Sequence, residues 1–179
     1  SDGLEDVCLG VEGAAGAGSG SRKPTGVTLL AKDEVGVAEQ TESSIVIDAP
    51  AQRVMDVIAD LGTYPEWAGV KATEVLRAFP DGRPAQVRMV IDNGPIKDTY
   101  TIEYEWHGDE KVTWQLTESE VLRDLDGTYT VTDRGDGSSE VSYRLVVDLM
   151  IPIIGSIKRK AEKAIVDAAL RGLKKRVEQ

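Results

Sequence analysis

Six runs of alternating apolar and polar residues, separated by short turns, constrain the fold of this chain most strongly. The runs cover residues 73–79, 86–92, 98–106, 111–117, 122–132 and 139–149. Asp81-Gly82, Asn93-Gly94 and Asp136-Gly137 supply the positive φ angles that tight hairpins need. Strands joined by such short turns predict an antiparallel meander. A seventh strand is expected upstream, over residues 41–48.

The alternation also assigns the two faces of this sheet. Residues two apart on a strand share a face, so every second position in each run points the same way. One face is polar, and the other is apolar and rich in aromatic side chains. The apolar face holds Met89, Ile91, Tyr100, Ile102, Tyr104, Trp114, Leu116, Tyr129 and Tyr143. Such a face must be covered by another element.

The C-terminal residues 153–178 supply that cover. They contain no proline and predict a helix of about 25 residues, long against a mean of about 11–12. Six small or apolar residues recur at helical spacing, and we expect this side of the helix to pack on the sheet: Ile154, Ile157, Ala161, Ile165, Ala168 and Gly172. Because several of them are small, space is expected to remain between helix and sheet.

Residues 41–178 resemble a known family. The matching segments are 45–51, 54–60, Tyr64-Pro65-Glu66-Trp67 and Ile151-Pro152. They are similar to the START-like (SRPBCC) superfamily, in its polyketide cyclase/dehydrase and coenzyme Q-binding branch. The resemblance implies an α+β helix-grip fold, in which a curved seven-stranded antiparallel sheet wraps around a long C-terminal helix. Two short helices follow the first strand, and an elongated apolar cavity takes lipids, quinones or polyketides.

Residues 1–40 differ in composition from the rest. They hold 8 of the 18 glycines and no aromatic residue, so we expect a flexible, disordered tail before a START-like ligand-binding domain over 41–179. Asp2, Glu5 and Asp6 stand where a secretory signal needs basic residues. No stretch approaches the roughly 18 apolar residues of a membrane span. We therefore expect a cytoplasmic protein.

Charge and composition exclude several classes of function. The net charge of -10 argues against nucleic-acid binding, and one Cys with one His cannot form a zinc site. His107 falls in a predicted turn, and the pair Glu103 and Glu105 falls on the polar face. We therefore expect no catalytic residues, no metal and no cofactor.

The expected ligand-binding residues line the space between sheet and helix. They are Trp67, Met89, Ile91, Tyr100, Ile102, Tyr104, Trp114, Leu116, Tyr129, Tyr143, Ile157 and Ala161. A hydrophobic small molecule is the expected partner. The C-terminal helix carries eight basic and three acidic residues, so a transient contact with a membrane stays open. A homodimer formed through this helix or through a sheet edge also stays open.

The sequence leaves three hypotheses about function open. The protein either holds a lipid, quinone or polyketide-like molecule, or acts as a polyketide cyclase/aromatase by positioning a substrate in the same cavity. It could also be a regulatory protein with no ligand. The cyclase hypothesis lacks a convincing acid/base pair on the apolar face.

Overall fold

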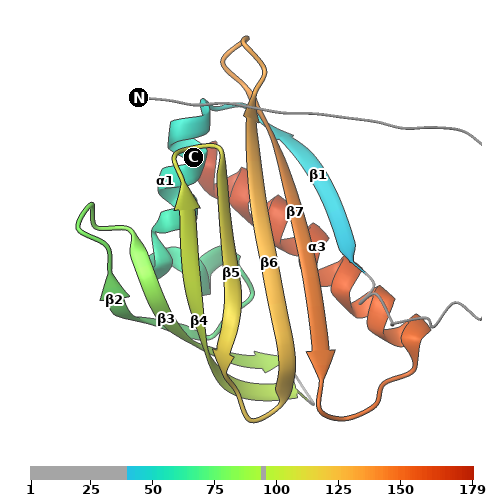
Figure 1. Cartoon of the computed structure of the whole chain (residues 1–179). Coiled ribbons are helices and arrows are strands. Elements are labelled where there is room, and N and C mark those ends of the chain that lie inside the picture. The colour runs from blue at the N-terminus through green and yellow to red at the C-terminus, as the bar shows by residue number, and fades with distance from the viewer. Residues whose placement is uncertain (1–39, 94–95) are drawn as a thin grey trace, which may run out of the picture. The chain divides into compact units, whose positions relative to one another are not determined.

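The computed structural model describes residues 40–93 and 96–179. Its seven strands form one antiparallel sheet with the order β1-β7-β6-β5-β4-β3-β2 (Figure 1). The strands are β1 (Thr41–Ile47), β2 (Ala72–Ala78), β3 (Pro84–Asn93), β4 (Ile96–His107), β5 (Lys111–Glu118), β6 (Leu122–Asp133) and β7 (Ser139–Leu149). The meander predicted from the turn residues is confirmed. The glycine-rich segment lies outside the described residues, apart from Gln40.

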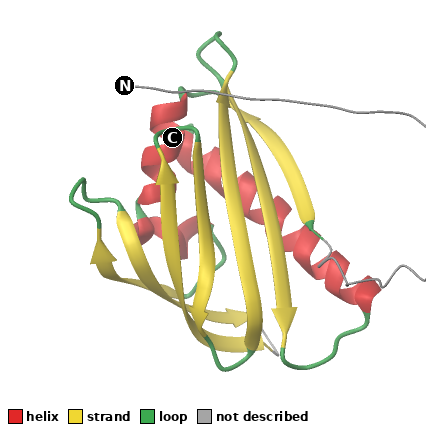
Figure 2. Ribbon diagram, in the orientation of Figure 1, coloured by secondary structure: helices red, strands yellow, loops and turns green. Residues whose placement is uncertain are grey.

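Short helices follow β1, and one long helix closes the chain (Figure 2). The elements are α1 (Ala51–Ala59), the 3-10 turn η1 (Leu61–Thr63), α2 (Tyr64–Trp67) and α3 (Gly155–Val177). The curved sheet and the long C-terminal helix match the helix-grip arrangement implied by the resemblance. The alternation of apolar and polar residues fixes the strands, and the 3.6-residue spacing fixes the helices.

The strand pairing confirms the predicted faces. Tyr104 lies opposite Trp114, and Tyr129 lies opposite Tyr143. We call this apolar side of the sheet the inner face, because its middle is buried beneath the helices. Val87, Val112 and Val141 on this face are fully buried.

Helix α3 does not pack on the sheet through the side that the sequence predicted. Its buried face consists of Glu162, Val166, Ala169, Leu170, Leu173 and Val177. In the predicted stripe, Ile154 is 70% exposed, Ile157 is 56% exposed and Ile165 is 47% exposed. Ala161 is also exposed, so the expectation that this stripe covers the sheet is wrong.

The position of α3 over the sheet explains this difference. The helix packs on the edge of the sheet formed by β1 and β7, and on α1. Its first turns extend past the strands (Figure 1). Apolar residues occupy two sides of α3, and only the side that meets β1 and β7 becomes buried.

Candidate ligand-binding site

Four aromatic side chains form a continuous cluster in the middle of the inner face. The Trp114 ring centroid lies 5.9 Å from that of Tyr104, 5.4 Å from that of Tyr129 and 5.7 Å from that of Tyr143. The Tyr129 and Tyr143 centroids are 4.5 Å apart. Tilted rings at these separations attract one another through their quadrupoles as well as through burial. Four adjacent strands, β4 to β7, thus contribute to one aromatic surface.

The hydroxyl groups of the inner tyrosines are neutral hydrogen-bond donors. Burial raises the pKa values of Tyr129 and Tyr143 well above their ordinary value. The Tyr64 hydroxyl donates to the Ile58 carbonyl at 2.5 Å, and the Tyr100 hydroxyl contacts the Met89 sulfur at 3.5 Å. The Tyr129 and Tyr143 hydroxyls make no hydrogen bond to another described residue. They are therefore available to a polar group that enters the interior.

On strands β3, β5 and β7 the inner face is more deeply buried near the strand beginnings than near the strand ends. Strands β3, β5 and β7 run in the same direction, so their first residues lie at one end of the sheet and their last residues at the other. Residues near their beginnings, Val87, Val112 and Val141, are fully buried. Residues near their ends are only half-buried; these are Ile91, Leu116, Val147 and Leu149. On the intervening strand β6, Leu122 and Leu125 at this same end are buried.

Helix α3 also has an exposed apolar side. It begins shortly after β7 ends, and a Cβ atom added at Gly172 would overlap the Trp67 carbonyl oxygen. This side of α3 therefore faces α2. At 100° per residue, Ile165, Ala161 and Ile154 lie within about 20° of the direction of Gly172. The predicted stripe is thus an apolar side of α3 that meets α2 at Gly172 and is exposed at Ile154, Ala161 and Ile165.

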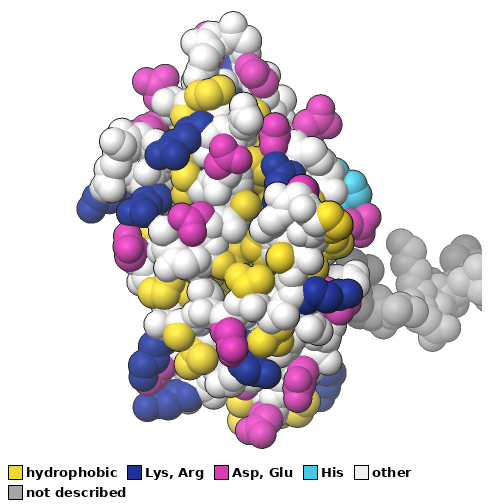
Figure 3. Space-filling model, turned by 90° about the vertical axis from the view of Figure 1, so that its left-hand side faces the viewer, with side chains coloured by type: hydrophobic (Ala, Val, Ile, Leu, Met, Phe, Trp, Pro, Cys, Tyr) yellow, Lys and Arg dark blue, Asp and Glu magenta, His cyan; other side chains and the backbone are white. Residues whose placement is uncertain are grey.

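The predicted site residues divide into two groups. Tyr100, Ile102, Tyr104, Trp114, Tyr129, Tyr143 and Met89 are buried together on the inner face. Trp67, Ile91 and Leu116 are half-buried against this core, whereas Ile157 and Ala161 are exposed on α3. On the molecular face that carries β2, apolar side chains gather near the middle between charged residues (Figure 3). The structure therefore packs Trp67, Ile91 and Leu116 against the buried aromatic centre and leaves Ile157 and Ala161 exposed on α3.

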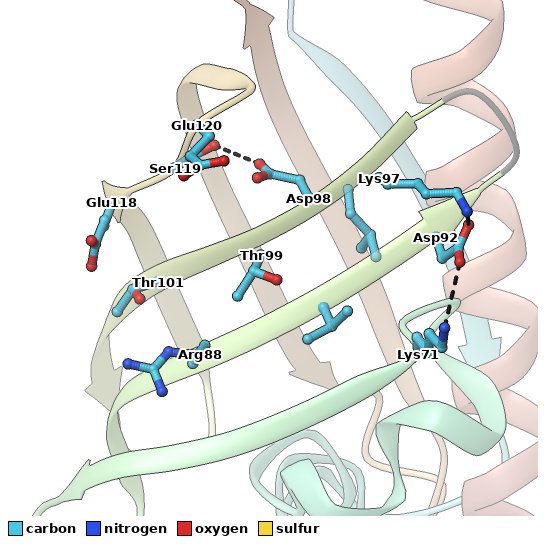
Figure 4. A pocket seen from close by; sticks show the side chains of 12 residues that line it. Lys71, Arg88, Asp92, Lys97, Asp98, Thr99, Thr101, Glu118, Ser119 and Glu120 are labelled. Carbon is cyan, nitrogen blue, oxygen red and sulfur yellow. Dashed lines mark hydrogen bonds and ion pairs between the residues drawn. The ribbon is translucent and has the colours of Figure 1, made fainter.

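A separate hollow of about 650 Å³ lies on the polar side of β3, β4 and β5 (Figure 4). Two of its lysines form ion pairs with the same carboxylate. Lys71 Nζ lies 3.5 Å from Asp92 Oδ2, and Lys97 Nζ lies 3.4 Å from Asp92 Oδ1. The Ser119 hydroxyl donates to Asp98 at 2.5 Å. No sequence signal indicated this hollow, because its residues belong to the alternation typical of a solvent-facing strand surface.

The candidates for acid/base or metal chemistry lie apart from the aromatic centre. His107 is half-exposed, and its Nε2 lies 3.3 Å from Glu105 Oε1. Glu103 pairs with Arg77 on the outer face at 3.3 Å. Residues 40–93 and 96–179 contain no group of three or more His, Cys, Asp or Glu side chains that could hold a metal ion. Asp98 and Glu162 are buried acids that sequence analysis missed. Glu162 lies within a lysine-rich stretch that is typical of a polar helix side.

Comparison with known proteins identifies the family. The family model described as polyketide cyclase / dehydrase and lipid transport matches residues 38–178. The chain belongs to this family. No curated protein sequence matches it. The match spans the described domain and includes every strand and helix of the grip.

Solved structures of this family's fold are similar over most of the domain. A START superfamily protein from Mycobacterium smegmatis has a TM-score of 0.72 and 19% identity, over 78% of this chain and 97% of that one. TTHA0849 from Thermus thermophilus has a TM-score of 0.66 and 27% identity, over 78% and 97%. The Zhui aromatase/cyclase from Streptomyces sp. R1128 has a TM-score of 0.65 and 15% identity, over 78% and 93%. These likenesses establish the START-like fold.

Within the described part of the chain, no helix combines the length and the apolar character needed to cross a membrane.

Proposed function

We propose that this protein binds a hydrophobic small molecule between the inner face of the sheet and the apolar side of α3. The observation that carries the proposal is the difference in burial along the inner face. On β3, β5 and β7 the face is fully buried at Val87, Val112 and Val141, and half-buried at Ile91 and Leu116. Small-molecule sites are usually concave and mostly apolar, with a few polar groups that orient the ligand.

The energetics of such binding come from apolar burial. Transfer of a ligand's apolar surface from water contributes roughly 25 cal/mol per Å², before the cost of ordering is subtracted. The Tyr129 and Tyr143 hydroxyls would orient a polar group of the ligand, because both are neutral donors without a partner among the described residues. A lipid, a quinone and a polyketide-like molecule share this chemistry of an apolar body with a few polar groups.

A cyclase function on the same site is the second proposal. A neutral tyrosine hydroxyl can donate to a carbonyl oxygen and stabilise the charge that develops during an aldol-type ring closure. Tyr129 and Tyr143 lie side by side, with ring centroids 4.5 Å apart, and so could hold neighbouring carbonyls of one chain. Incubation with a poly-β-keto thioester would separate the two functions, because a carrier returns the substrate unchanged.

The test of binding uses displacement of a fluorescent apolar probe, N-phenyl-1-naphthylamine, from the purified protein. Leu116 on the inner face and Gln115 on the outer face are neighbours on β5, half-buried and exposed respectively. We expect Leu116→Arg to lower probe affinity at least about tenfold, because it places a charge in the site. Gln115→Arg adds the same charge outside and should bind as the wild type does. Equal binding by both variants, with native circular dichroism, would place the probe elsewhere.

A further inference from the structure

Glu162 is the outermost residue of the buried face of α3. It is 3% exposed, and the next buried residue along the helix is Val166, one turn later. Between Gly155 and Ala161 the helix is exposed, apart from the half-buried Lys158. Glu162 therefore lies where α3 leaves the sheet, beside the exposed apolar turns at the start of the helix.

The two carboxylate oxygens of Glu162 have different surroundings. Thr41 on β1 donates its hydroxyl proton to Oε2 at 2.9 Å. Oε1 is buried and has no hydrogen-bond donor in the described part of the chain. The Lys158 ammonium lies 3.8 Å from Oε1, which is beyond hydrogen-bond distance. One oxygen is thus satisfied, and the other is left without a donor.

A buried carboxylate oxygen without a hydrogen-bond donor destabilises the folded protein unless another group donates to it. A buried carboxylate oxygen loses its hydration, and buried acceptors in native proteins almost always receive a hydrogen bond. The other members of this face, from Val166 to Val177, are apolar and pack on the core. A leucine or valine at position 162 would continue that pattern, so simple packing does not account for the glutamate.

We propose that Oε1 of Glu162 accepts a hydrogen bond from the polar head of the bound molecule. The inference rests on the proposed function and names the class of ligand: an apolar chain or ring system that ends in a hydrogen-bond donor, a hydroxyl or a protonated amine. A ligand with a carboxylate head brings no donor for Oε1 at neutral pH. The site therefore selects alcohols and amines over acids of the same chain length.

The experiment compares three probes that share one apolar tail: 1-dodecanol, dodecylamine and dodecanoate. Each is titrated against the protein loaded with N-phenyl-1-naphthylamine at pH 7. In the wild type we expect dodecanol and dodecylamine to bind about tenfold more tightly than dodecanoate, the usual worth of a hydrogen bond to a charged group. Glu162→Gln should reduce the advantage of dodecylamine over dodecanoate by about tenfold.

Two further variants serve as controls for charge and for the neighbouring contact. Glu140 is exposed on β7, so Glu140→Gln makes the same change of charge away from the site and should keep the wild-type order. Thr41→Val removes the donor to Oε2 but leaves Oε1 in place, and it should also keep the preference for donor heads. Circular dichroism and thermal melting verify that each variant is folded.

The outcomes separate the two proposals. If none of the three probes displaces the dye from the wild type, the proposed function fails. If all three bind with similar affinity in the wild type, the function stands and the role of Glu162 is overturned, and this comparison needs no variant. If a folded Glu162→Gln variant keeps the full wild-type order, Oε1 is completed by water rather than by the ligand, and the inference is likewise overturned.

Discussion

Gly127 on β6 lies directly opposite Trp114 on β5, and a Cβ atom at position 127 would overlap the indole ring. The indole occupies the space that a side chain at position 127 would fill. The missing side chain of one strand thus makes room for the central ring of the aromatic cluster. Glycine in a strand interior often marks such a close approach.

Substitution of this glycine should therefore disturb the aromatic centre. We expect Gly127→Ala to destabilise the protein by about 2–3 kcal/mol, because the Trp114 ring must move out of a packed position. Urea unfolding followed by tryptophan fluorescence measures this change. Gly62→Ala is the control, because its Cβ would meet Asp60 Oδ1 at an ordinary 3.5 Å. A Gly127→Ala protein as stable as the control would show that the indole has room to shift.

The two apolar sides of α3 should respond differently to a buried charge. Val166 is fully buried, whereas Ile157 is 56% exposed. Val166→Asp is expected to cost about 3 kcal/mol or more, because an unpaired carboxylate enters the core. Ile157→Asp should stay within about 0.5 kcal/mol of the wild type. Urea unfolding measures the free energy of unfolding of both variants. A large decrease for Ile157→Asp would mean that this turn of α3 is covered in solution.

Ionisation of the inner tyrosines predicts a loss of stability at high pH. Burial raises the pKa values of Tyr100, Tyr129 and Tyr143 above their ordinary value of 10.0. The unfolded chain therefore loses these protons first, so the free energy of unfolding is unaffected below pH 10 and falls as the pH rises above it. Urea midpoints measured from pH 8 to pH 11.5 should show this decline. A double variant with Tyr129→Phe and Tyr143→Phe should decline less steeply, and an unchanged slope would contradict the assignment.

Arg83 should act as a clamp between two hairpins. Its guanidinium donates to the Gly108 carbonyl and to the Asp109 carboxylate, at 2.5 and 2.6 Å, and lies 5.2 Å from the Trp106 ring centroid. Lysine cannot reproduce this forked and stacked geometry, so Arg83→Lys should cost about 1 kcal/mol. Arg77→Lys is the matched control, since its exposed pair with Glu103 contributes little. Thermal melting of both variants measures this difference. An equal decrease in Tm for Arg83→Lys and Arg77→Lys would argue against the clamp.

The strands and their faces could be predicted because they depend on local patterns. Alternation with a period of two specifies which side of each strand is apolar, and the Asp-Gly and Asn-Gly pairs specify where it turns. The pattern alone therefore places Trp114 and Tyr143 on the correct face of the sheet. The tyrosine cluster follows directly from that assignment.

The buried side of α3 depended on the tertiary structure. Helical spacing gives two apolar sides, one through Ile157 and Ile165 and one through Val166 and Leu173, and a pattern cannot say which one meets β1 and β7. The same holds for Glu162, whose burial depends on where the helix crosses the sheet edge. The amino-acid sequence by itself determined the elements and the apolar face, because these follow from short-range periodicity. Only the packing of α3 against β1, more than a hundred residues earlier in the chain, decided which apolar side of the helix stays exposed and that Glu162 is buried.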